Sequence, residues 1–274
     1  MSPFSLVQVA VARTPFPTPS EVAAEGGPGR IEVAPECEAA LLGIEAASHL
    51  VVLSFLQQAD RSRLQVRPKH SGPASELRGV FATRSPARPN PIGLSVVPLR
   101  RREGLVLHVD RLDLADQTPI VDLKPYSPGL DLVFSAVHRR RTCPATRDPE
   151  AFAAVLEREL EAHLGANAGH PEARLALAAV FIATRRLQLD PRSPELHLAV
   201  NRLGPSLDAV LALTGATFAS GRLEVRPSDS PPSFVFRAGS RRIDATARPG
   251  AMPGGAPSTW EDALDVVSSP ARSG

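Results

Sequence analysis

The first half of the chain consists of short apolar segments of strand length, and no long amphipathic helix separates them. Proline and glycine stand between many neighbouring segments, as expected where turns interrupt strands. The segments lie at residues 6–12, 31–33, 49–56, 64–66, 79–82, 94–97, 105–109 and 120–123. Short strands at near-regular spacing are typical of β-barrels and sandwiches. We therefore predict a mainly β domain, a barrel or a sandwich, over residues 1–141, and the pattern argues against a doubly wound α/β fold.

The second half of the chain follows a different pattern. Residues 149–163 and 171–187 carry apolar side chains at helical spacing, and residues 206–213 read as a further helix. Residues 196–200 and 234–236 read as strands, so we predict an α+β domain over residues 148–246. Glycine, proline and serine dominate from residue 249 on, and we expect a disordered tail over residues 247–274.

The composition excludes several classes of protein. Apolar residues make up 43% of the 274 residues, enough for a buried core, and the net charge of +2 excludes a histone-like or strongly acidic chain. The two cysteines, Cys37 and Cys143, cannot form a disulfide framework or a cysteine-rich zinc site, so we expect no metal. The start has no signal-peptide pattern, and no segment is apolar enough for a membrane helix. We expect a cytoplasmic protein that does not bind membranes.

The most informative segment is the loop at residues 79–95. Prolines at positions 86, 89 and 91 fix the backbone and exclude a helix there. The loop is therefore stiff, and it presents Arg84, Ser85, Arg88 and Asn90 in set directions. Rigid polar loops on a β scaffold are typical of ligand-binding sites. The alternative is a proline-rich connector with solvated arginines.

A second informative segment, residues 112–126, contains a turn from Asp116 to Pro119. Its carboxylates Asp113, Asp116 and Asp122 could together hold a hard cation. Their spacing matches no known metal-binding loop, however, and Lys124 lies among them, so we expect no metal here either.

Positive charge is concentrated between Arg61 and Arg102. This stretch has ten basic residues and one acidic residue, Glu76, in a chain whose net charge is only +2. Such a concentration is typical of a phosphate-binding face, and a solvated arginine-rich surface is the alternative. The basic candidates for substrate binding, from this stretch and from the second informative segment, are Arg61, Arg63, Arg67, Lys69, Arg88 and Lys124.

The two informative segments resemble the TsaA/TrmO-type family of S-adenosylmethionine-dependent tRNA methyltransferases. The resemblance rests on GVFATRSPARPNPIGLS at 79–95 and LDLADQTPIVDLKPY at 112–126, and it covers residues 5–135. It implies a compact β-barrel methyltransferase that acts as a homodimer and holds its cofactor in loops near the subunit interface. It also implies the substrate, the exocyclic N6 of threonylcarbamoyl-adenosine beside the tRNA anticodon.

The resemblance also implies a set of cofactor-binding positions. They are Pro28, Gly29, Leu56, Gln57, Arg84, Leu94, Ser95, Asp116, Gln117, Thr118 and Pro119. Two of them depart from the family pattern. Gln117 replaces a glycine, and it would be strained if that glycine had a positive φ. Gln57 stands where the family often has histidine; glutamine keeps hydrogen-bonding capacity but cannot accept a proton at neutral pH.

Part of the second half, SLDAVLALTGATFASGRLEV at 206–225, weakly resembles an FmdE-like domain. That domain has cysteine where this chain has Ala216, and its upstream cysteine is also missing near His170. Loss of both cysteines makes a zinc site improbable by ligand count. We interpret the domain as a degenerate module for dimerisation or substrate capture.

Methyl transfer from a sulfonium needs little acid–base chemistry, because the cofactor already carries the activated methyl group. A hydrogen bond from N6–H to an acceptor would favour attack, and the candidate residues are Asn90, Asp113, Asp122 and Tyr126. Two other functions stay open at this point. The chain could methylate another small or nucleotide substrate, or it could be a non-catalytic cofactor-binding scaffold.

Overall fold

The computed structural model describes residues 5–23, 25–67, 76–136, 148–253 and 257–270. These residues divide into two compact units, one comprising the described residues up to Leu132 and the other those from Val133 on. Each unit has its own hydrophobic core. Residues 137–147, where the sequence predicts the link between two domains, lie outside the described residues.

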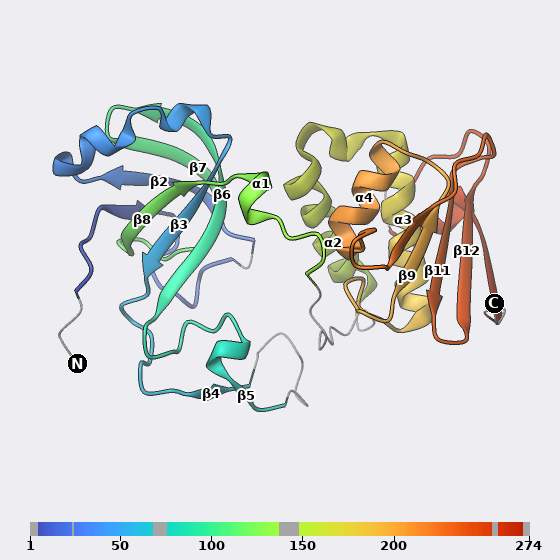
Figure 1. Cartoon of the computed structure of the whole chain (residues 1–274), viewed down its shortest axis with the longest axis horizontal. Helices are drawn as coiled ribbons and strands as arrows, with labels where there is room; N and C mark the ends of the chain where they lie inside the picture. Colours follow the sequence, from blue (N-terminus) through green and yellow to red (C-terminus); the bar gives the residue numbers. More distant parts are fainter. Residues whose placement is uncertain (1–4, 24, 68–75, 137–147, 254–256, 271–274) are drawn as a thin grey trace. The chain divides into compact units, whose positions relative to one another are not determined.

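The first unit contains a closed barrel of six antiparallel strands in the order β1-β2-β7-β6-β3-β8, which confirms the predicted β-barrel (Figure 1). The strands are β1 (Ala10–Arg13), β2 (Gly27–Val33), β3 (His49–Phe55), β6 (Ile92–Glu103), β7 (Val106–Leu112) and β8 (Pro119–Pro125). Strands β4 (Gln65–Val66) and β5 (Arg78–Gly79) form a separate two-stranded ribbon. Short helical turns are η1 (Pro35–Leu41), η2 (Ile44–Ala46), η4 (Val80–Ala82) and α1 (Pro128–Asp131).

The barrel forms because side chains on alternate positions of each strand point inward. In β3, Leu50, Val52 and Ser54 are fully buried, whereas their neighbours in sequence are only half-buried. The outward-facing neighbours Val51 and Leu53 are also apolar. For this reason the sequence of β3 reads as a continuous apolar run and hides the alternation.

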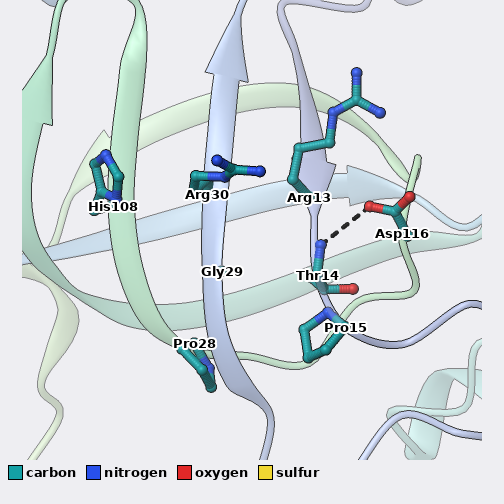
Figure 2. A pocket seen from close by; sticks show the side chains of 8 residues that line it. All are labelled: Arg13, Thr14, Pro15, Pro28, Gly29, Arg30, His108 and Asp116. Carbon is teal, nitrogen blue, oxygen red and sulfur yellow. Dashed lines mark hydrogen bonds between the residues drawn. The ribbon is translucent and has the colours of Figure 1, made fainter.

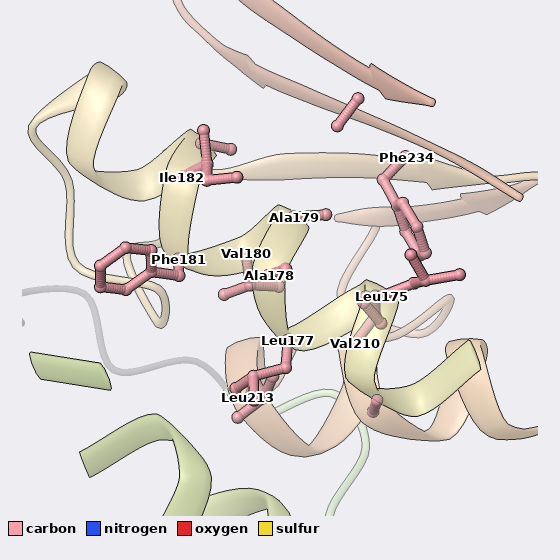
Figure 3. Close-up of a cluster of buried hydrophobic side chains, with 14 of the residues drawn as sticks. Leu175, Leu177, Ala178, Ala179, Val180, Phe181, Ile182, Val210, Leu213 and Phe234 are labelled. Carbon is pink, nitrogen blue, oxygen red and sulfur yellow. The ribbon is translucent and has the colours of Figure 1, made fainter. Parts of the chain in front are cut away.

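The second unit is α+β, as predicted. Its five-stranded sheet has the order β10-β9-β11-β12-β13. The elements are α2 (Pro149–Leu164), η5 (Gly165–Gly169), α3 (Pro171–Leu187), β9 (His197–Val200), α4 (Pro205–Thr214), β10 (Leu223–Val225), β11 (Ser233–Ala238), β12 (Arg241–Ala247), η6 (Pro257–Ala263) and β13 (Leu264–Pro270). Residues 175–184 of α3 are all buried, because the helix packs against α4, α2 and the sheet (Figure 3). A helix that is apolar all round belongs in such a core.

The prediction of a disordered tail over residues 247–274 is wrong for the described part of that segment. Residues of β13 pair with all seven residues of β12, from Arg241 to Ala247. Trp260 is fully buried, with its ring edge-on to Phe181 at 5.1 Å between centroids. The tail is rich in turn-forming residues, but a single large aromatic side chain and a run of strand pairing supply the burial that orders it.

Candidate functional site

One end of the barrel brings together an end of each of the six strands, with the turns that adjoin them, and we call it the rim. Strands β1, β3 and β7 end at the rim, and β2, β6 and β8 begin there, because neighbouring strands are antiparallel. The strand pairing confirms this: Phe55 is opposite Ile92, Ser54 is opposite Ile120, and Gly27 is opposite Leu112. Residues far apart in sequence therefore meet at the rim.

Most of the positions that the resemblance assigns to the cofactor lie on strand ends or turns of the rim. They are Pro28, Gly29, Leu56, Gln57, Leu94, Ser95, Asp116, Gln117, Thr118 and Pro119. Not all of them can face a ligand. A Cβ on Gly29 would lie 3.1 Å from the carbonyl oxygen of Arg13 and 3.0 Å from Cδ2 of Leu112, so this glycine is needed for close packing of β2.

Several hydrogen bonds tie the turn before β8 to the end of β1. The backbone amide of Thr14 donates to Oδ1 of Asp116 at 3.1 Å. The amide of Asp116 donates to the carbonyl of Phe16 at 2.7 Å, and that of Gln117 donates to the carbonyl of Ala12 at 2.9 Å. The turn is thus held rigidly, with the Asp116 carboxylate at its surface.

Gln117 has a φ of +63°, which is the left-handed region that favours glycine. The conditional expectation of strain at this position is therefore met. Its side-chain amide donates to Oδ2 of Asp116 at 3.3 Å, a contact that glycine could not make. The departure from the family pattern costs backbone energy and adds one weak link to the turn.

The loop before β6 holds its two arginines differently. The Arg88 guanidinium donates to the carbonyls of Ser85 at 2.8 Å, Val80 at 3.0 Å and Thr83 at 2.6 Å. This side chain therefore braces the loop, and its role in binding substrate stays a prediction. Arg84 is exposed and has no hydrogen bond or ion pair to any residue that the structure describes. The braced loop thus presents one free guanidinium.

Inside the rim, Ser95 Oγ donates to Oδ1 of Asp113, which fixes that carboxylate just beyond the end of β7. Ser54 lies nearby on β3, and its buried Oγ has no hydrogen-bond partner within the described ranges. A Cβ at Gly93 would overlap this oxygen, so any other residue there would force the Ser54 hydroxyl to turn away. Sequence reasoning missed Ser54, because a serine inside an apolar strand gives no signal of its own.

The structure separates two of the four catalytic candidates from the rim. Asp122 lies part-way along β8, where Oδ2 pairs with Nζ of Lys124 at 2.6 Å. Tyr126 lies beyond the other end of β8, and its amide donates to the carbonyl of His49 at 2.9 Å. At about 3.3 Å per residue, Tyr126 is roughly 20 Å from the rim end of the strand. Asn90 and Asp113 remain at the rim, whereas the roles predicted for Asp122, Tyr126 and Lys124 lose their geometric support.

The basic stretch at residues 61–102 is not one face, which corrects the sequence-based prediction. The twelve residues of β6 place Arg100, Arg101 and Arg102 at the strand end opposite the loop, roughly 30–40 Å away along the strand. All three pair locally: Arg100 Nε with Asp110 at 2.5 Å, Arg101 with Glu103 at 3.2 Å, and Arg102 with Glu45 at 2.9 Å.

The basic residues near the loop also have local partners. Arg61 Nε donates to the carbonyl of Pro89 at 3.0 Å, and Arg63 Nε pairs with Asp60 at 3.0 Å. Hydrogen bonds from Ser62 and then Arg63 hold the pKa of Asp60 below its usual value. Arg67 has a partner as well, and Lys69 lies outside the described residues.

A cleft of about 530 Å³ lies beside the rim, on the outer wall of β1, β2 and β7 (Figure 2). This is the size of a small-molecule site. Its lining consists of Arg13, Thr14, Pro15, Pro28, Gly29, Arg30, His108 and Asp116. Three of the predicted cofactor positions are among these, but Arg13, Arg30 and His108 were missed, because isolated basic residues on separate strands form no sequence motif.

The donor set fits S-adenosylmethionine. The cofactor carries a carboxylate, an ammonium group, ribose hydroxyls and a cationic sulfonium. Asp116 offers a carboxylate, Arg84 offers a free guanidinium, and Ser54 offers an unsatisfied hydroxyl. Across the part of the chain that the structure describes, no three His, Cys, Asp or Glu side chains gather to hold a metal. His170 instead accepts the amide of Glu172 at 3.2 Å and caps α3.

Comparison with known proteins agrees with this geometry. The tRNA-methyltransferase O N-terminal domain family matches residues 11–132, which spans the barrel strands almost completely. A protein of Archaeoglobus fulgidus named "Probable S-adenosyl-L-methionine-binding protein" is 47% identical over 135 residues, or 48% of this chain and 36% of its own length. The chain thus spans only about a third of that relative.

Two further relatives are covered more fully. An S-adenosyl-L-methionine-binding protein, also of A. fulgidus, is 39% identical over 132 residues, which is 47% of this chain and 93% of that protein. The tRNA (adenine(37)-N6)-methyltransferase of Escherichia coli is 36% identical over 176 residues, which is 58% of this chain and 74% of the enzyme. The chain is therefore a barrel protein of the S-adenosylmethionine-binding type. It belongs to the TrmO family of tRNA methyltransferases. None of the helices in the described ranges has the length and apolar character to cross a bilayer.

Proposed function

We propose that this chain transfers a methyl group from S-adenosylmethionine to N6 of threonylcarbamoyl-adenosine beside the tRNA anticodon. The observation that carries the proposal is the convergence of the cofactor positions on the rim, next to a free guanidinium and a fixed carboxylate. The E. coli relative is named as a methyltransferase of N6 of adenine 37 in tRNA, which supports this substrate.

The residues at the rim would bind and orient. S-adenosylmethionine supplies an activated methyl group, so the protein needs to place N6 about 3–3.5 Å from it, in line with the sulfur. Arg84 would hold a carboxylate or phosphate through paired hydrogen bonds. Asp113, fixed by Ser95, can accept a hydrogen bond from N6–H and so raise the availability of the nitrogen lone pair.

We further propose that the protein acts as a homodimer through the outer face of β3 and β6. Three cross-strand pairs on this face are apolar: Val51 with Val96, Leu53 with Leu94, and Phe55 with Ile92. The β6 members are 38–50% exposed, and Phe81 in the adjoining loop is 83% exposed. Contiguous exposed apolar surface of this kind is typical of an interface, and its continuity with Leu94 would place a cofactor position at the dimer boundary.

The proposed nucleic-acid partner is the anticodon stem-loop, whose single-stranded bases can be splayed out for access. Such a substrate implies a cytoplasmic site of action. The logarithm of the RNA affinity should fall linearly with the logarithm of the salt concentration, because phosphates release their counterions when they are bound. The exposed basic groups near the loop, Arg61 and Arg63, are the first candidates for these phosphate contacts, since their present partners are a carbonyl and a local carboxylate.

The proposal is tested in two steps. Calorimetric titration with S-adenosylmethionine measures cofactor binding, and mass analysis of nucleosides from tRNA of cells lacking the protein measures the product. Loss of N6-methylated threonylcarbamoyl-adenosine in those cells is the expected result. Cofactor binding without any change in tRNA nucleosides would favour a different methyl acceptor, and absence of cofactor binding would favour a non-catalytic scaffold.

A further inference from the structure

Four basic side chains form a row across the outer wall of the barrel. Arg13 on β1 is directly opposite Arg30 on β2, which is directly opposite His108 on β7, which is directly opposite Arg101 on β6. Figure 2 shows Arg13, Arg30 and His108 side by side on neighbouring strands, and all three line the cleft. Arg13 and Arg30 are both cationic, and like charges directly opposite each other on neighbouring strands destabilise a sheet. The row therefore calls for compensation.

Carboxylates of the protein neutralise only part of this basic row. Glu32 pairs with Arg13 at 2.7 Å, and Glu103 pairs with His108 at 3.0 Å and with Arg101 at 3.2 Å. Arg30, between these pairs, is exposed and has no hydrogen bond or ion pair to any residue in the described ranges. A guanidinium with five donors thus stands open beside the cleft.

The cleft also carries an acidic end. Asp116 lines it, and only its Oδ1 is used by the backbone of Thr14, while Oδ2 takes one long bond from Gln117. A ligand that satisfies both ends has a carboxylate for Arg30 and hydroxyl or N–H donors for Asp116. An extended RNA backbone offers only its ribose 2′-hydroxyls as donors, and its phosphates would be repelled by Asp116. The volume of about 530 Å³ also suits a small group rather than a polymer backbone.

We propose that this cleft binds the threonyl part of the substrate base, with Arg30 holding its carboxylate. The inference rests on the proposed function, which places a threonylcarbamoyl group on the nitrogen that is methylated. That group has the carboxylate, the hydroxyl and the N–H donors that the cleft requires. The cleft shares Pro28, Gly29 and Asp116 with the predicted cofactor positions, so a substituent on the reacting nitrogen can reach it. Arg30 then lets the protein distinguish modified from unmodified adenosine.

The test uses the full chain and three synthetic anticodon stem-loops. One carries N6-threonylcarbamoyladenosine, the second its methyl ester, and the third plain adenosine. Fluorescence anisotropy gives the affinity for each without turnover, and kcat/KM is measured for the same RNAs. The wild type should prefer the free acid to the ester by about 10- to 100-fold, the range for a charge-assisted pair.

Arg30→Gln should abolish the preference for acid over ester without changing the affinity for the ester. Arg30→Lys should restore part of it, because the charge returns without the paired donors. Arg241→Gln, which removes an exposed arginine from β12, is the matched control and should keep the full preference. Since Arg30 is exposed, these variants should fold, and thermal unfolding checks this.

Three results would overturn the inference. An equal loss of affinity for all three stem-loops in Arg30→Gln would assign Arg30 to an RNA phosphate. Loss of S-adenosylmethionine affinity by calorimetry, with the acid preference intact, would assign it to the cofactor carboxylate. If the wild-type protein binds the free-acid stem-loop no more tightly than the methyl ester, the cleft does not recognise the carboxylate. If the wild type shows the preference but methylates none of the RNAs, the proposed function fails while the binding site stands.

Discussion

The Asp116 carboxylate accepts the backbone amide of Thr14 at 3.1 Å, across 102 positions of sequence. This bond joins the turn before β8 to the exit of β1, the two strands that close the barrel. The same carboxylate lines the cleft, as Arg30 does. One side chain thus ties the turn before β8 to the end of β1 and belongs both to the predicted cofactor positions and to the proposed substrate cleft.

Asp116→Ala should lower both stability and cofactor affinity. Removing the acceptor leaves the Thr14 amide without its partner, at a cost of about 1–2 kcal/mol in the free energy of unfolding. Urea unfolding measures this, and calorimetry measures the affinity for S-adenosylmethionine. Asp116→Asn is the matched control, since its amide oxygen can still accept from Thr14. If the Asp116→Asn variant has as low a free energy of unfolding as the Asp116→Ala variant, the hydrogen bond from Thr14 does not stabilise the turn.

Gln117→Gly should stabilise the protein. The φ of +63° is strained for glutamine and unstrained for glycine, and relief is worth about 0.5–1 kcal/mol after the entropy that glycine adds to the unfolded chain. Thermal unfolding provides the measurement. Gln58→Gly is the control, because Gln58 is an exposed turn residue without a positive φ, and it should be neutral or destabilising. A destabilised Gln117→Gly would mean that the bond from Gln117 to Asp116 outweighs the strain.

Arg84→Ala should lower cofactor affinity without lowering stability, whereas Arg88→Ala should lower stability. Arg84 has no partner in the described ranges, so its loss should leave stability unchanged and cost about 1.5–3 kcal/mol of S-adenosylmethionine affinity. Arg88 holds three carbonyls of the loop, and its loss should lower the free energy of unfolding by about 1–3 kcal/mol. Paired calorimetry and urea unfolding on both variants check this. Unchanged affinity in Arg84→Ala contradicts its assignment.

The barrel was predictable because strand length, turn residues and spacing are local properties of sequence. The polar rim followed from the resemblance, whose motifs at 79–95 and 112–126 both adjoin strand ends of the rim. The basic row was not predictable. Arg13, Arg30 and His108 meet only through the register of β1, β2 and β7, and register is a tertiary property.

The prediction of a single basic face from the charge count along the sequence was wrong for a related reason. The stretch at residues 61–102 is basic as a string, yet β6 carries Arg100 and Arg102 to the strand end opposite the loop, where carboxylates from other elements neutralise them. The prediction of a disordered tail was wrong because composition does not reveal burial or strand pairing. Trp260 is buried in the core, and β13 pairs with β12.

Val96→Glu should dissociate the proposed dimer. Val96 lies in the apolar face opposite Val51 and is 42% exposed, so the substitution leaves the barrel core intact. A glutamate buried in an apolar interface without a partner should weaken association by roughly 100-fold. Light scattering across a concentration series measures the mass. Val267→Glu, at an exposed position of β13, is the control and should leave the mass unchanged. A wild type that is monomeric at micromolar concentration contradicts the dimer itself.

The final prediction concerns which carboxylate or phenol acts on N6. Asp113 is fixed by Ser95 at the rim, whereas Tyr126 lies beyond the far end of β8 beside His49. Asp113→Asn should lower kcat by roughly 10- to 100-fold, since an amide oxygen is a weaker acceptor for N6–H than a carboxylate. Tyr126→Phe should leave kcat and KM within about twofold of the wild type, because roughly 20 Å of strand separates it from the rim.

Steady-state methylation of the threonylcarbamoylated stem-loop measures both variants, and calorimetry checks that each still binds S-adenosylmethionine. Ser95→Ala supplies the positional control: it keeps the Asp113 carboxylate but removes the hydroxyl that fixes it, so kcat should fall less than in Asp113→Asn. If Tyr126→Phe loses as much activity as Asp113→Asn, the reacting nitrogen does not sit at the rim within one subunit. The phenol would then have to reach the reacting nitrogen from a second copy of the chain, and mixing the two inactive variants should restore activity by complementation.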